Sequence, residues 1–173
     1  MILSWLDAEK PGGVDLTQPV RIASDSVARK DVVSIEALQV NLHGLANHGV
    51  CHIDGSAHGF VVYHCVRCLD EFRESLRVPI HEVFSRYPLT SAQEEEDVVY
   101  EPGDEIVLDP FVLQAVILGL KYQPICKEDC AGLCPSCGVN LNHNTCHCKD
   151  RTIDPRLEAL AELLDKTNED RRS

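Results

Sequence analysis

Six cysteines lie close together near the C-terminal end of the chain, and this feature restricts the possible folds most strongly. They fall between residues 126 and 148 of a chain of 173 residues with nine cysteines in all. In a reducing compartment, clustered thiols are more often metal ligands than disulfide partners. The first ten residues lack the basic and apolar pattern of a secretion signal, so we expect a cytoplasmic protein. The cysteines therefore predict metal binding.

The spacing of four of these cysteines predicts one structural zinc site. Zinc prefers four thiolate or imidazole ligands in a tetrahedron, and a two-residue spacing lets one tight turn present two sulfurs to the same ion. Cys134 and Cys137 have that spacing, and Gly138 can adopt the left-handed conformation that such a turn uses. Cys146 and Cys148 are two residues apart and project to one side of an extended segment. We expect these four cysteines to bind one ion.

Four further cysteines form two pairs that could build a second site. Cys65 and Cys68 repeat the two-residue spacing, and Cys126 and Cys130 could share one face of a helix at the i, i+4 spacing. Spacing alone leaves open whether the two pairs meet, so the sequence predicts one or two zinc ions. Cys51 is left over, and we expect it to be a buried small hydrophobic residue.

Other roles for these residues receive less support. Cys65 and Cys68 could form a redox pair, but such a motif usually opens a helix in a βαβ unit, whereas the surrounding residues have strand character. His143 and His147 stand beside better zinc ligands, and we expect both to be exposed. Six more histidines lack ligand-like spacing and are expected mostly at the solvent-facing side of strands and turns: His43, His48, His52, His58, His64 and His81.

Hydrophobic periodicity predicts an α+β fold. Alternating apolar residues from Val33 to Leu42 indicate a bulged strand or two short strands, and residues 47–49 are typical of a turn. Residues 50–54 and 59–65 are β-rich, and Leu76, Val78 and Ile80 alternate again. Short strands joined by short connections predict an antiparallel β meander or a partly closed barrel. Two helices and a C-terminal cysteine-rich zinc-binding module complete the predicted fold.

The predicted organisation has four parts. Residues 1–31 form an extended segment with little regular structure, and residues 32–125 form a β-rich core. This core includes an acidic loop at 94–109 and a buried helix at 110–121, which begins where Asp109 caps Pro110. Residues 126–150 form the zinc module. Residues 151–173 form a C-terminal helix, opened by Asp154 and Pro155, and a charged tail.

The distribution of charge restricts the possible partners. The net charge is −12, and residues 94–109 hold eight acidic residues with no lysine or arginine. An acidic surface repels nucleic-acid phosphates, so a basic protein is a better partner than RNA. The chain has no Gly-rich phosphate loop, no nucleophile elbow and no His-Glu-x-x-His motif, so we expect no enzyme and no small-molecule substrate. The apolar stretch at 110–120 is too short to cross a membrane, which takes about 20 residues.

A longer set of residues resembles the YceD family in order and spacing, over roughly residues 30–165. The matching positions are Cys65-Val-Arg-Cys68-Leu69, Phe72, Leu108-Asp109, Pro124, Cys126, Cys130-Ala-Gly-Leu-Cys134-Pro-Ser-Cys137-Gly-Val-Asn-Leu-Asn142, Cys146, Cys148 and Asp154-Pro-Arg156. The resemblance implies a bacterial or plastid protein needed for normal levels of large-subunit (23S) ribosomal RNA. Members of the family differ in how many C-terminal cysteines they keep, which implies that zinc is not the whole of their shared activity.

Three hypotheses for function follow. The first is a ribosome-biogenesis factor that handles a basic ribosomal protein or the pre-ribosomal large subunit and affects the RNA indirectly. The second is a zinc-dependent RNA-binding module, and the third is a thiol redox protein. The first agrees best with the acidic charge.

Overall fold

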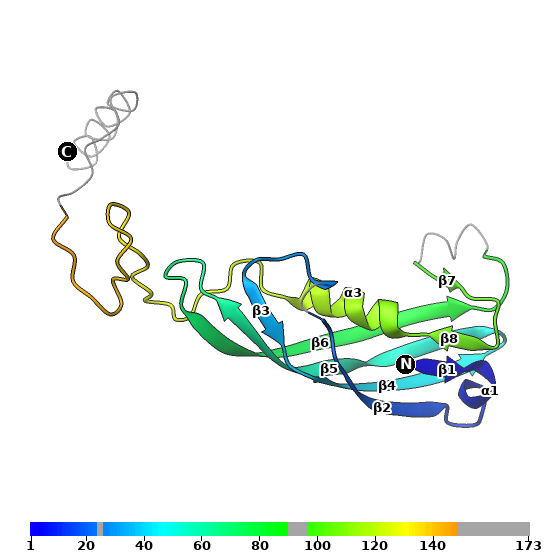
Figure 1. Ribbon diagram of the computed structural model, residues 1–173. Helices are drawn as coiled ribbons and strands as arrows, with labels where there is room; N and C mark the ends of the chain where they lie inside the picture. The colour runs from blue at the N-terminus through cyan, green and yellow to red at the C-terminus, as the bar shows by residue number, and fades with distance from the viewer. Residues whose placement is uncertain (24–25, 90–96, 149–173) are drawn as a thin grey trace, which may run out of the picture. The chain divides into compact units, whose positions relative to one another are not determined.

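The computed structural model describes residues 1–23, 26–89 and 97–148 (Figure 1). The chain divides into two compact units, residues 1–130 and residues 131–173. The second is described to residue 148, so the predicted C-terminal helix and tail lie outside the described residues. The helices and strands are β1 (Ile2–Ser4), α1 (Trp5–Ala8), β2 (Val14–Val20), β3 (Val32–Ile35), β4 (Leu38–Asn47), β5 (Val50–His64), β6 (Glu71–Ser85), β7 (Val99–Tyr100), β8 (Glu105–Val107) and α3 (Asp109–Gly119).

The main sheet is built around an antiparallel meander of β4, β5 and β6, as the sequence predicts. The strand order is β2-β4-β5-β6-β7, with β3 also pairing β5. A two-residue turn joins β4 to β5, where His48 and Gly49 have φ of 51° and 76°, as tight hairpin turns require. In the described residues the strand path is open at β2 and β7, so the alternative of a partly closed barrel is not confirmed.

Alternation along the strands places the core on one face of this sheet. Leu38, Val40 and Leu42 of β4 are buried, whereas the residues between them are half-buried and polar. Helix α3 packs on this face beside β6, where Gly119 lies against Val78. The small β1–β8 sheet and α1 cover the other end of the same face, next to β4. The buried face of the sheet thus lies under α1, α3 and the β1–β8 pair.

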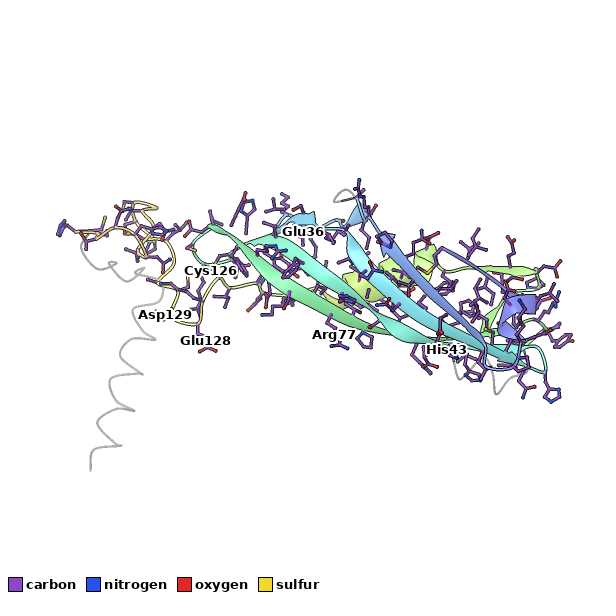
Figure 2. All side chains as sticks on the ribbon, turned by 90° about the horizontal axis from the view of Figure 1, so that it is seen from below. Glu36, His43, Arg77, Cys126, Glu128 and Asp129 are labelled. Atoms are coloured by element: carbon purple, nitrogen blue, oxygen red, sulfur yellow. The ribbon has the colours of Figure 1, made fainter. Side chains whose placement is uncertain are left out.

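The opposite face of the sheet is polar. Successive strands place Asp15, His43, Asp54 and His81 in one row across the sheet. The Nδ1 atom of His43 lies 2.8 Å from Oδ1 of Asp15, and Nδ1 of His81 lies 2.5 Å from Oδ1 of Asp54. Figure 2, which views the molecule from below, marks His43 and Arg77 on this face. Most histidines are therefore exposed, as expected, although His43 and His64 are half-buried.

Several expectations about the elements are wrong. The predicted acidic loop at 94–109 contains the strands β7 and β8 in its described part. The first 31 residues contain β1, α1 and β2, because the side chains of Leu3 and Trp5 reach the core. The strands β5 and β6 have 15 residues each, so they are long rather than short. The predicted buried helix is only partly buried: Val112 and Val116 face the core, but Leu118 is 76% exposed. Its first turn also includes Asp109, which makes no side-chain cap.

Among the described residues, no helix has the length and apolar character needed to span a membrane.

Candidate metal centres

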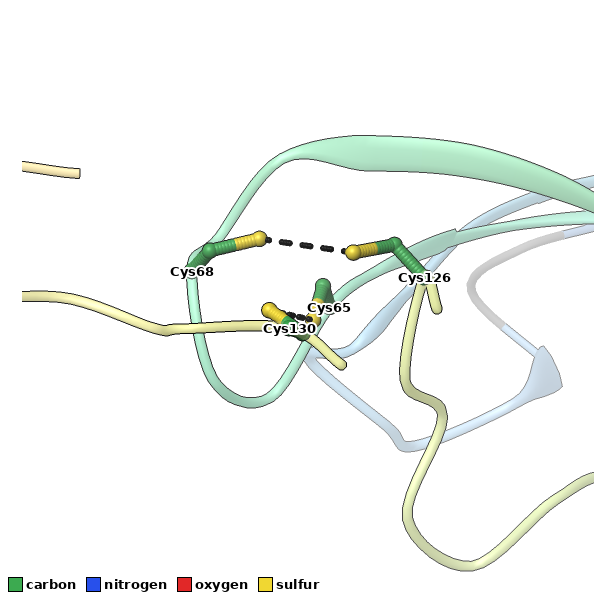
Figure 3. A group of neighbouring side chains, drawn as sticks. All are labelled: Cys65, Cys68, Cys126 and Cys130. Carbon is green, nitrogen blue, oxygen red and sulfur yellow. Dashed lines mark hydrogen bonds between the residues drawn. The ribbon is translucent and has the colours of Figure 1, made fainter. Parts of the chain in front are cut away.

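The first candidate centre joins the β5–β6 hairpin to the segment that follows α3. Residues 65–70 connect β5 to β6 and carry Cys65 and Cys68. Figure 3 shows Cys126 and Cys130, which come from a later segment, pointing at these two residues. The sulfurs of Cys65 and Cys130 are 3.8 Å apart, and those of Cys68 and Cys126 are 3.7 Å apart. All four sulfurs lie within 4.8 Å of one another, which is close enough to hold one metal ion.

Backbone contacts hold the two segments of this centre together. The N–H of Val66 donates to the carbonyl of Pro124 at 3.0 Å, and the guanidinium of Arg67 donates to the carbonyl of Cys130 at 3.3 Å. Further back, the N–H of Lys121 donates to the hydroxyl of Tyr63 at 3.3 Å. The side chains of Cys65, Cys68 and Cys130 are buried. The centre is therefore a protected part of the first unit.

The second candidate centre lies wholly within the second unit. The sulfur of Cys146 is 3.3 Å from that of Cys134 and 3.6 Å from that of Cys137, and Cys148 completes a group within 4.8 Å. A β-bridge between Leu133 and Asn140 closes the loop that carries Cys134 and Cys137. Unlike the first centre, this one exposes Cys137 and Cys148 to solvent.

The same turn occurs in both centres. The N–H of Cys65 donates to the carbonyl of Asp70 at 2.9 Å, and the N–H of Leu69 donates to the carbonyl of Cys65 at 2.9 Å. The second centre repeats both bonds at 2.8 Å, from Cys134 to Val139 and from Gly138 to Cys134. The residue after the second cysteine has positive φ in each turn, 64° for Leu69 and 74° for Gly138. Two unrelated stretches of sequence thus fold into the same sulfur-presenting knuckle.

Backbone N–H groups also stabilise one thiolate in each centre. Burial acts to raise the pKa of Cys65, but backbone N–H groups of Cys126, Cys68 and Arg67 outweigh it and lower the pKa to about 6. In the second centre, the N–H groups of Cys137 and Ser136 lower the pKa of Cys134 to about 6. Hydrogen bonds to a charged sulfur favour its charged form.

The other thiols with a resolved shift keep their protons at neutral pH. Burial raises the pKa values of Cys68 and Cys126. In the second centre, the N–H of Cys148 acts to lower the pKa of Cys146, but the sulfurs of Cys134 and Cys137 and burial together outweigh it, and the pKa is raised. The sulfurs of Cys146 and Cys137 raise the pKa of Cys148 to about 12. At neutral pH each centre therefore contains one ionised thiol, Cys65 or Cys134, beside protonated thiols.

The donor sets fit zinc. A tetrahedral ion with Zn–S bonds of about 2.3 Å holds its sulfurs about 3.8 Å apart, close to the separations found here. Both sets consist of four sulfurs, the composition typical of structural zinc, and leave no open position for a water. The chemistry that a bound zinc ion would supply is cross-linking of chain segments. Backbone N–H groups that point at the sulfurs would offset the negative charge of a four-thiolate site.

The structure brings together all eight cysteines that the sequence offers as ligands, in the predicted groups of four. One geometric expectation is wrong: no helix spans Cys126 and Cys130, which approach through a turn in which the N–H of Cys130 donates to Lys127. His143 and His147 are exposed, as expected. Cys51 is fully buried, and burial raises its pKa to about 11.

Sequence reasoning missed three supporting residues of the first centre. Arg67 binds the carbonyl of Cys130, and Leu69 takes the left-handed conformation. Asp70 accepts the N–H of Cys65 and a hydrogen bond of 3.5 Å from the sulfur of Cys68. The role of Leu69 could have been found by aligning the two knuckles, because Leu69 occupies the position that Gly138 has in the other.

Both centres lie in the region that matches a known family. A family model described as "Large ribosomal RNA subunit accumulation protein YceD" matches residues 53–164, from within β5 past both groups of cysteines. The chain belongs to the YceD family. The description of the family names an accumulation protein and not an enzyme.

Curated relatives of this YceD-family protein come from mycobacteria. An uncharacterised protein of Mycobacterium tuberculosis is 38% identical over 115 residues, which cover 65% of this chain and 55% of the relative. An uncharacterised protein of Mycobacterium leprae is 33% identical over 114 residues, covering 65% of this chain and 52% of the relative. The matches thus span about half the length of these relatives. No solved structure matches the chain.

Substitutions at the equivalent positions of the two knuckles, Leu69 and Gly138, should have different effects on zinc affinity. Leu69→Gly removes the steric strain of a leucine in the left-handed backbone conformation. We therefore expect the zinc affinity of the first centre to be unchanged or higher. Gly138→Ala forces a Cβ into the left-handed region, which costs about 1–2 kcal/mol although no atom lies within 4 Å of the new carbon. Zinc affinity of the second centre should therefore fall about tenfold. Competition with a chelator measures both. Equal losses in both variants would contradict the shared turn.

The pKa values predict how many protons zinc displaces. At about pH 7.5 the thiols of Cys65 and Cys134 are already ionised, so the displaced protons come from the other thiols. At about pH 5.3 these two thiols are protonated as well, so each ion should displace about one more proton and bind more weakly. Calorimetry in buffers of different ionisation enthalpy measures the release. The same release at both pH values would show that neither pKa is lowered.

Proposed function

We propose that this protein is a non-enzymatic, cytoplasmic ribosome-biogenesis factor that supports the accumulation or processing of large-subunit (23S) ribosomal RNA. The observation that carries the proposal is the family match, which includes the β5–β6 hairpin and both groups of four cysteines. In this account two structural zinc ions hold the fold, and the working surface lies elsewhere. Each zinc would have all its coordination positions filled by sulfur, so the metal itself would do no chemistry.

The direct partner in this account is a basic ribosomal protein or the pre-ribosomal large subunit. The net charge of −12 supports a basic protein partner, because polyanion surfaces attract cations and repel phosphates. In the acidic segment, the exposed residues include Asp97, Asp104 and Glu105. Asp104 pairs with Arg86, so part of this charge is already balanced within the chain. The effect on ribosomal RNA would then be indirect.

Two other hypotheses have weaker support. A zinc-dependent RNA-binding module needs a basic face, and the overall charge opposes one. A thiol redox protein needs a pair of sulfurs that react with each other, whereas here the sulfurs converge in fours at separations that suit a metal. Both hypotheses remain outcomes that the following experiments distinguish.

Depletion of the protein should lower the large-subunit RNA selectively. We expect the ratio of large- to small-subunit ribosomal RNA to fall in depleted cells, with precursor species accumulating, because unassembled ribosomal RNA is degraded. Expression of the intact chain should restore the ratio. RNA gels or sequencing that resolve precursors measure both. An unchanged ratio in well-depleted cells would contradict the proposal.

Copurification from these cells distinguishes a factor that handles a basic ribosomal protein from an RNA-binding module. Neutralising Glu94–Asp97 by isosteric substitution to glutamine and asparagine should abolish copurification of a ribosomal protein. Glu9→Gln and Glu71→Gln serve as a control at exposed acidic residues of the first unit. Direct binding of the purified chain to precursor RNA, unaffected by the neutralised segment, would favour the RNA-binding module instead.

A further inference from the structure

A groove runs between helix α3 and the edge of strand β6. It has a volume of about 420 Å³, and its walls come from two elements: Val78, Pro79, Ile80, His81 and Glu82 on β6, and Gln114, Ala115, Leu118 and Gly119 on α3. A second hollow of about 310 Å³ lies on the far side of Leu118 and Gln114, lined also by Pro110, Leu113 and Ile117. Leu118 is thus an apolar ridge between two hollows.

The surfaces around the groove have no covering element in the described part of the chain. From Glu71 to Val83, β6 pairs a described strand only on its β5 side, since β7 contacts only the last two residues of β6. Leu118 is 76% exposed and Ile117 is 37% exposed on the adjoining helix. Exposed apolar side chains gathered beside a groove are typical of protein-binding surfaces.

One end of the groove carries negative charge. Glu82 is half-buried, and among the described residues it forms no ion pair with a lysine or arginine. Burial raises its pKa; the nearby His81 acts to lower it, and the carboxylate of Asp97 acts to raise it. His81 itself faces the other side of the sheet, where it pairs with Asp54. Helix α3 contributes no cation, because Asp109 is its one charged residue. A half-buried carboxylate beside an apolar floor suits a lysine or arginine.

The edge strand restricts how an occupant can bind. Pro79 lies in the middle of the lining and has no N–H, so it interrupts the row of donors that a paired strand would need. Side chains are therefore better able than a long added strand to fill this groove.

We propose that the groove between α3 and β6 binds a lysine- or arginine-rich segment of a ribosomal protein. An apolar side chain of that segment packs against Leu118 and Val78, and a neighbouring cation lies against Glu82. This inference rests on the proposed function for the class of partner and adds the place where it binds. The groove shares no lining residue with either cysteine centre.

Site-specific photocrosslinking of the full chain tests this assignment. A benzoyl-phenylalanine photocrosslinker replaces Leu118 in one variant and Leu45, which is 45% exposed on the opposite face of the sheet, in the control. The probe is the protein mixture extracted from purified large ribosomal subunits, freed of RNA. We expect position 118 to give cross-links to one or a few basic proteins, at least five times the yield from position 45.

A charge reversal tests the role of the carboxylate. In the chain labelled at position 118, Glu82→Lys should lower the cross-link yield at least fivefold, whereas Glu71→Lys, on the same strand but at an exposed position, should leave it unchanged. Retained metal content and circular dichroism establish that both variants are folded.

Several outcomes would contradict the proposal that this groove binds a partner. These are equal yields at positions 118 and 45, a yield insensitive to Glu82→Lys, or products that join position 118 to a second copy or to another part of the same chain. The ribosomal-RNA ratio in depleted cells then separates the two proposals. A selective loss of large-subunit RNA with no cross-link from position 118 would leave the proposed function standing and reject the groove.

Discussion

The first unit depends on the contact between the β5–β6 hairpin and the chain that follows α3. Cys65 and Cys68 lie at the end of the longest strand pair, and their partners, Cys126 and Cys130, come nearly sixty residues later in the sequence. Without an ion, these four thiols, three of them buried, are weak donors and acceptors for one another. An ion would convert them into a cross-link that closes a long loop, whose ends are costly in entropy to hold together. It would also fix the exit of α3 relative to the sheet on which the helix packs.

The second centre has the same turn between its first two cysteines, within a shorter stretch of chain. Its loop is short, its cysteines are partly exposed, and the described part of its unit contains only one isolated β-bridge. The described part of this unit has little apolar core, so a cross-link would stabilise it. Zinc would therefore supply long-range order in the first unit and the local fold itself in the second. The groove along α3 shares no lining residue with either group of cysteines, so the residues that would bind zinc differ from those that we propose bind a partner.

The turns, the strands and the grouping of Cys134 and Cys137 could be predicted from the sequence, because the signals for them are local. The spacing of Cys134 and Cys137, the turn at His48 and Gly49, and the alternation along β6 each specify geometry within a few residues. Long-range pairing could not be predicted in this way: no local pattern states that Cys126 meets Cys68, or that Trp5 reaches the core. The apolar character of α3 was misleading for the same reason. An all-round apolar helix indicates burial only when something covers both sides, and in the described residues the side around Leu118 is uncovered.

The central claim is that two groups of four cysteines each hold one zinc ion. The most direct test is native mass spectrometry of the intact chain, purified without chelator, with metal content checked by elemental analysis. The account predicts two zinc ions per chain, one in a Cys65→Ser variant, and two in a Cys51→Ser variant, which lacks only the buried cysteine outside both groups. Well under one zinc per chain, or a mass that shows disulfides in place of metal, would contradict it.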